Sequence, residues 1–114
     1  DCDNLTSVII PNSVTTIGKE AFQNCKSLIN VNIPNSVTTI GEQAFAYCEK
    51  LTSMDIPNSL TTVESGTFRD CKKLTSVNIR SGVKTIGMEA FKNCKSLSNI
   101  NIPNSVTSIG ESAF

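Results

Sequence analysis

The sequence predicts a repeat solenoid, in which the chain coils and stacks a parallel β-sheet on one face. Cysteines and phenylalanines both recur with a strict period of 23 residues. The two sets are Cys2, Cys25, Cys48, Cys71 and Cys94, and Phe22, Phe45, Phe68, Phe91 and Phe114. A period of this length is typical of stacked repeats, each too small to bury its own apolar face.

The period divides residues 1–114 into a single array of about five units. Their ranges are 2–24, 25–47, 48–70, 71–93 and 94–114, and we call them units one to five. Ordering each backbone residue costs about 1–2 kcal/mol, whereas burying one large apolar side chain returns about 1.5–3 kcal/mol. One unit therefore needs the apolar faces of its neighbours. Because the chain begins and ends inside a unit, we expect a fragment of a longer array, with uncapped repeats that associate end to end.

The first strand of each unit is predicted by the pattern Leu-x-x-Val-x-Ile. In unit two, Val31 and Ile33 alternate with Asn30 and Asn32, so the apolar pair faces inward and the asparagines face outward. Pro-Asn-Ser then ends the strand, because proline has no N–H for the ladder and Asn-Ser favours a turn. Val-Thr-x-Ile predicts a second short strand on the return side. The segment Gly-x-x-Ala-Phe-x-x-Cys predicts one turn of 3₁₀ or α-helix.

Two units depart from this pattern. Unit three has Glu64 where the other units have glycine, and its glycine lies two places later at Gly66, which predicts a different turn. Unit four has Arg80-Ser81-Gly82 in place of Pro-Asn-Ser. Glycine at the third position suggests that this turn needs, or tolerates, a positive φ.

The pattern Ile-Pro-Asn-Ser-Val-Thr-x-Ile-Gly-x-x-Ala-Phe-x-x-Cys-x-x-Leu, from Ile33 to Leu51, resembles the BspA-like class of leucine-rich repeats. The resemblance covers essentially the whole chain. It implies a right-handed leucine-rich-repeat coil from a cell-surface protein, with roles in adhesion or protein binding. It brings no catalytic residues, and it implies that the concave strand face contacts the ligand.

We therefore assign the candidate ligand-binding site to the outward strand positions of units two to five. They are Asn30, Asn32, Ser53, Asp55, Ser76, Asn78, Asn99 and Asn101. These side chains are short, polar and nearly uncharged, whereas protein-binding hot spots favour Trp, Tyr and Arg. A solvated sheet face with ladders of side-chain amides is the alternative, and weak contact with carbohydrate or peptide stays open.

The cysteines allow three interpretations. Stacked cysteines lie about 4.8 Å apart, but their parallel Cα–Cβ vectors and odd number do not suit disulfides. A straight column cannot converge tetrahedrally on zinc. Buried free thiols that pack as small apolar residues are the favoured interpretation.

The composition excludes several classes of function. The chain has 10 basic and 10 acidic side chains and no histidine. Balanced charge argues against general binding to nucleic acid or to an anionic membrane, and no segment approaches the roughly 18 apolar residues of a membrane span. Without histidine, a converging carboxylate pair or a glycine-rich loop, the sequence predicts no enzyme, no metal and no cofactor.

A column of charged residues follows the cysteines, namely Asp3, Lys26, Glu49, Lys72 and Lys95. The first four alternate in sign, which favours a role in register and solubility. Lys72, Lys73, Arg80 and Lys84 make unit four locally basic, but this is a small patch without aromatic residues.

These observations predict a non-enzymatic, extracellular or cell-surface module for adhesion or protein–protein interaction, with a protein or an extracellular-matrix component as ligand. A passive spacer or stalk within a larger surface protein is one alternative. An intracellular scaffolding array is another.

Overall fold

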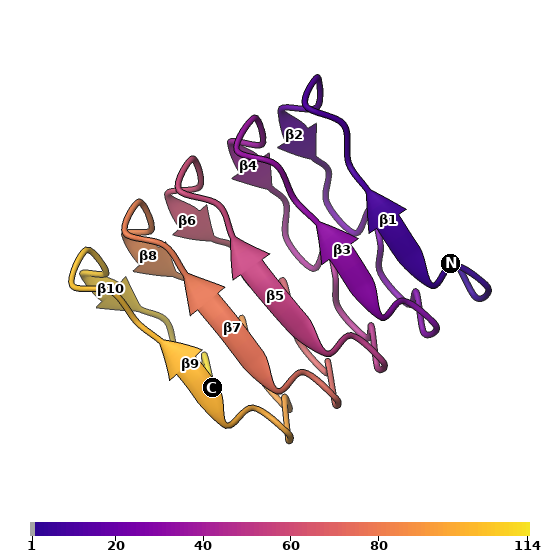
Figure 1. The fold of residues 1–114 in the computed structure, drawn as a ribbon. Helices are drawn as coiled ribbons and strands as arrows, with labels where there is room; N and C mark the ends of the chain where they lie inside the picture. Colours follow the sequence, from indigo (N-terminus) through magenta and orange to yellow (C-terminus); the bar gives the residue numbers. More distant parts are fainter. Residues whose placement is uncertain (1) are drawn as a thin grey trace.

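The computed structural model describes residues 2–114 as a stack of coils (Figure 1). Each coil contributes two short strands, one to each of two columns. The first column contains β1 (Ser7–Ile9), β3 (Asn30–Asn32), β5 (Ser53–Ile56), β7 (Ser76–Ile79) and β9 (Asn99–Asn101). The second contains β2 (Thr16–Ile17), β4 (Thr39–Ile40), β6 (Thr62–Val63), β8 (Thr85–Ile86) and β10 (Ser108–Ile109). All paired strands are parallel and join equivalent residues of successive units, such as Val8 with Val31. The chain is therefore a β-solenoid, as predicted.

The strands form where apolar and polar residues alternate. In β5, Met54 and Ile56 are buried, whereas Ser53 and Asp55 are exposed. The apolar residues of β5 face the interior of the coil, and the polar ones form the outer surface of the sheet.

The return segments contain no helix within residues 2–114, which corrects the prediction of a 3₁₀ or α-helical turn. In unit one, Glu20 and Asn24 have left-handed φ angles of 58° and 62°, and residues in that conformation do not continue a right-handed helix. The backbone N–H groups of the turn instead donate alternately to carbonyls of the same turn and of the next unit. The Cys25 N–H donates to the Phe22 carbonyl within the turn (3.2 Å), whereas the Phe22 N–H donates to the Ala44 carbonyl of the next unit (2.7 Å).

The turn of unit three follows the same path as the others, so the prediction of a different turn there is wrong. Gly66 has a φ of 63°. The equivalent residues of the other units, with φ between 54° and 58°, are Glu20, Gln43, Glu89 and Ser112. The Gly66 N–H also donates to the next unit, at 2.9 Å from the Met88 carbonyl. Glycine thus occupies a left-handed position that other residues adopt at some conformational cost.

Gly82 does not have a positive φ, which corrects the second expectation about glycine. A Cβ atom at this position would collide with the carbonyl oxygen of Asn58 in the preceding unit. Close approach of the backbone, rather than an unusual φ, explains the glycine at this turn.

The interior is a continuous stack of side chains. The five phenylalanine rings stack with centroids 5.3–5.6 Å apart and interplanar angles of 6–12°. Phe45, Phe68 and Phe91 are fully buried, whereas Phe114 is 52% exposed. Each ring therefore completes the packing of its neighbours, as expected for units that cannot fold alone.

All five cysteines are free, and Cys25, Cys48 and Cys71 are buried. The buried-thiol interpretation is confirmed for these three, whereas Cys2 and Cys94 are half-buried. The Cys48 Sγ donates to the carbonyl oxygen of Phe22 at 3.3 Å. Burial raises the pKa of the Cys48 thiol to about 12, because a thiolate loses its hydration inside the coil.

Both columns of strands are interrupted at the boundary between units two and three, which we call the seam. On one side β1 pairs with β3, and β2 pairs with β4. On the other side β5, β7 and β9 form one sheet, and β6, β8 and β10 form another. The return segments stay connected across the seam, because the Phe45 N–H donates to the Thr67 carbonyl at 2.9 Å.

Glu64 explains the interruption between β4 and β6. At the equivalent Gly41 and Gly87, an added Cβ would lie 2.5 Å from the Lys19 nitrogen and 2.8 Å from the Ser65 nitrogen of the preceding unit. These glycines allow a hydrogen bond to the preceding unit, such as that from the Gly87 N–H to the Val63 carbonyl (2.7 Å). Glu64 carries a Cβ at the equivalent position, and its N–H makes no such bond to unit two within residues 2–114.

Candidate ligand-binding face

The predicted site residues lie on the outer surface of the first column of strands. Seven of them are exposed and Ser76 is half-buried. Six line one shallow hollow of about 400 Å³ over β5, β7 and β9, namely Ser53, Asp55, Ser76, Asn78, Asn99 and Asn101. Met54 and Val77 also line this hollow, which we call the strand-face hollow. The β7 and β9 ladder brings Asn78 directly opposite Asn101.

The other two predicted residues, Asn30 and Asn32, belong to β3 on the far side of the seam. They therefore do not share a ladder with the other six. Asn32 instead lines a second, polar hollow of about 290 Å³ at the seam. The other residues lining this seam hollow are Ile33, Pro34, Asn35, Asp55, Pro57, Asn58 and Arg80. Asp55 borders both hollows and joins them into one surface.

Asp55 and Arg80 form a two-point ion pair at this junction. The Arg80 Nε donates to Asp55 Oδ1 at 3.0 Å, and its terminal nitrogen donates to Asp55 Oδ2 at 2.8 Å. The hydrogen bonds to Asp55 raise the pKa of Arg80 above its ordinary value. Both side chains are well exposed, so the pair is hydrated and contributes little to stability. It offers a fixed guanidinium plane and carboxylate to a ligand.

Arg80 is the residue of this surface that the outward strand pattern missed. It follows β7 at a position where the four other units carry proline after the equivalent strand. The feature of the sequence that could have identified Arg80 is its departure from the repeat pattern. Its contact with Asp55 becomes evident only when units three and four are stacked in register.

A second cluster of ions lies on the return segments of units three and four. Arg69 donates to Glu89 at 2.7 Å, and Lys92 donates to the same carboxylate at 2.8 Å. The hydrogen bond from Lys92, together with the charge of Arg69, lowers the pKa of Glu89. Arg69 pairs with Glu89 across successive coils, whereas Lys92 pairs with Glu89 within unit four, so we assign the cluster a role in register.

Within residues 2–114, no group of three or more His, Cys, Asp or Glu side chains is arranged to hold a metal ion. The same residues contain no helix long and apolar enough to cross a membrane.

The model of the BspA type leucine rich repeat region, described as six copies, matches residues 1–114. The chain belongs to the BspA-type leucine-rich-repeat family. This confirms the assignment made from the repeat pattern. Comparison with curated proteins gave no match.

Solved structures of bacterial proteins share this BspA-type fold. A leucine rich cell surface protein from Faecalibacterium prausnitzii is 36% identical, with a TM-score of 0.69 over 99% of the chain. Leucine-rich repeat proteins from Eubacterium ventriosum and Bacteroides ovatus are 30% and 29% identical, with TM-scores of 0.63 and 0.64 over 97% and 96% of the chain. The chain spans 38%, 42% and 40% of these three structures, in the order named.

Proposed function

We propose that this chain is a non-enzymatic binding module of a cell-surface or secreted protein, and that its strand face contacts a protein or extracellular-matrix ligand. The observation that carries the proposal is the continuous surface of the strand-face and seam hollows, joined at Asp55. Similarity to a leucine rich cell surface protein supports the extracellular location.

The chemistry of this surface suits a polar ligand. The amide side chains Asn78, Asn99 and Asn101 each offer both donors and acceptors, and Asp55 and Arg80 add one fixed pair of opposite charges. Arginine is enriched among residues that dominate protein interfaces. We therefore expect Arg80 to contribute more to binding than any of the asparagines.

The passive spacer is the second candidate, and one observation favours it. The outward residues of the strands include no aromatic side chain, although aromatic anchors provide much of the affinity of protein interfaces. In a spacer, these polar residues would serve only to keep the sheet face hydrated.

A binding screen against purified extracellular-matrix proteins, measured by surface plasmon resonance, distinguishes the two candidates. The test variant Asn78→Arg/Asn101→Arg places two long cations in the strand-face hollow. The matched control Thr16→Arg/Thr39→Arg changes two exposed neighbours of the second column, also paired across one ladder.

The adhesion proposal expects binding of at least one matrix protein, weakened about tenfold or more by the test variant, the equivalent of roughly 1.4 kcal/mol, and unchanged by the control. Absence of binding across the panel would favour the spacer. Equal affinity of the test variant and the parent would rule out the strand face as the binding surface.

A further inference from the structure

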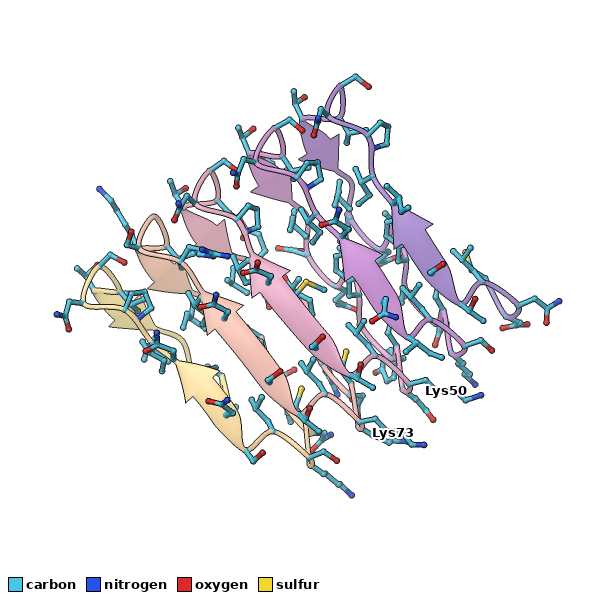
Figure 2. All side chains as sticks on the ribbon, in the orientation of Figure 1. Lys50 and Lys73 are labelled. Atoms are coloured by element: carbon cyan, nitrogen blue, oxygen red, sulfur yellow. The ribbon has the colours of Figure 1, made fainter. Side chains whose placement is uncertain are left out.

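A row of lysines lies in the turns that precede the strands of the first column. It consists of Lys26, Lys50, Lys72, Lys73 and Lys95, all exposed, and we call it the basic edge. Figure 2 shows Lys50 and Lys73 on neighbouring turns, where both side chains point away from the sheet. The basic edge lies apart from the strand-face and seam hollows, because none of its lysines lines either of them. Lys95 borders another hollow, beside Phe91 and Phe114.

Most of the positive charge of the basic edge is uncompensated. Among residues 2–114, Lys72 is its one lysine with an ion-pair partner, Glu49 at 3.1 Å. The sequence column contributes one further carboxylate, Asp3, at the position of unit one equivalent to Lys26, and within the described residues no ion pair joins the two. The neutral net charge of the chain therefore conceals a local excess of positive charge.

The balancing carboxylates lie elsewhere. Glu20, Glu42, Glu89 and Glu111 belong to the return segments. There, Lys19 pairs with Glu42 at 3.5 Å, and Glu89 pairs with both Arg69 and Lys92. The solenoid thus separates its charges, with several ion pairs on the return segments and mostly unpaired lysines on the basic edge.

The coil geometry arranges these lysines in a line. Lys50 and Lys73 occupy equivalent positions of units three and four, and Lys72 and Lys95 occupy equivalent positions of units four and five. Equivalent backbone positions of paired strands lie about 4.8 Å apart. The row therefore follows the axis of the solenoid, and a linear polymer with regularly spaced negative charges would contact several lysines at once.

We propose that the basic edge binds a linear sulfated polysaccharide, laid along the axis of the solenoid. The lysine ammonium group is a compact point charge, so it can form an ion pair with a sulfate group without a shaped pocket. The row contains no aromatic residue, and single-stranded nucleic acids gain much of their affinity from bases stacked on aromatic side chains. The geometry therefore favours the polysaccharide over a nucleic acid.

The test uses a heparin dodecasaccharide as the probe and measures its dissociation constant at several NaCl concentrations. The test variant is Lys50→Gln/Lys73→Gln. The matched control is Lys19→Gln/Lys84→Gln, which removes the same charge from exposed positions outside the basic edge. All four lysines are exposed, so both variants should fold, as circular dichroism and thermal unfolding will verify.

We expect the parent and the control to bind heparin at 0.15 M NaCl. The test variant should bind about tenfold more weakly, and the slope of log Kd against log salt concentration should fall by about two, roughly one for each lysine removed. Failure of the parent to bind, or equal weakening in both variants, would overturn the proposal. So would tighter binding of a single-stranded DNA of equal charge with the same dependence on Lys50 and Lys73, because the partner would then be a nucleic acid.

Discussion

The rings of Phe45 and Phe68 stack 5.6 Å apart across the one unit boundary at which both strand ladders are interrupted. The return side of the solenoid is therefore continuous, while the ladders of both strand columns are interrupted at the seam. The seam hollow borders this boundary, because Asn32 of unit two and Asp55 of unit three both line it.

Glu64→Gly should restore the missing hydrogen bond between units two and three. Removing the Cβ allows the amide of residue 64 to reach the Ile40 carbonyl, as Gly87 reaches Val63 at 2.7 Å. One hydrogen bond contributes about 1 kcal/mol, and added glycine flexibility costs roughly 0.5–1 kcal/mol. Global stability should therefore change little. Amide hydrogen exchange at residue 64 should slow about fivefold.

Glu64→Ala is the matched control for that experiment, because it removes the charge and retains the Cβ. Hydrogen exchange at residue 64 should then stay as in the parent. Equal slowing in the alanine and glycine variants would contradict the steric explanation of the seam.

Gly87→Ala should destabilise the solenoid. The new Cβ would lie 2.8 Å from the Ser65 nitrogen, so β8 would have to move away from β6. We expect the free energy of unfolding in urea to fall by about 1–3 kcal/mol. Gly18→Ala provides the comparison, since nothing lies within 4 Å of its added Cβ, and it should be neutral or stabilising by up to about 1 kcal/mol. Similar losses in both variants would argue against close packing as the role of this glycine column.

Phe68→Ala should be far more damaging than Phe114→Ala. Phe68 is fully buried between two rings, whereas Phe114 is 52% exposed and stacks on Phe91. Loss of a buried phenylalanine costs about 3–5 kcal/mol. Chemical unfolding of the two variants measures the difference. Comparable destabilisation by the two substitutions would show that Phe68 is no better packed than Phe114 at the end of the stack.

The buried thiols should make the fold sensitive to alkali. Below pH 9 the Cys48 thiol is protonated in both the folded and the unfolded chain, so its titration does not affect stability. Between the ordinary pKa of 9.0 and the folded-state pKa of about 12, the unfolded chain releases this proton and the folded chain retains it. The free energy of unfolding should therefore fall as the pH rises, by up to about 1.4 kcal/mol per pH unit for this thiol.

Cys48→Ala isolates this effect. Its free energy of unfolding, measured by urea denaturation between pH 9 and pH 11, should fall less steeply with pH than that of the parent. The comparison of slopes is independent of any overall stability lost with the sulfur. Identical slopes would mean that the Cys48 thiol does not remain protonated in the folded chain.

The candidate site was only partly predictable. Outward positions such as Asn78 and Asn101 follow from the two-residue alternation of a strand, so the sequence predicts which residues share that face. Asn30 fits the same pattern but lies beyond the seam, because the ladder between β3 and β5 is interrupted, which the alternation alone does not predict. Arg80 could be recognised as a departure from the repeat, yet its ion pair with Asp55 depends on the stacking of two units.

The sequence by itself determined the solenoid, its period, its inward and outward residues and its family, because every unit repeats the same local pattern and packs on a copy of itself. The tertiary structure decided what varies between units. It replaced the predicted helical turns with left-handed residues bonded to the next coil, and it assigned Gly66 to such a position and Gly82 to a close backbone contact. It also interrupted both strand ladders at the seam and aligned the lysines of the basic edge. These features depend on the distance between successive units, which a local pattern does not encode.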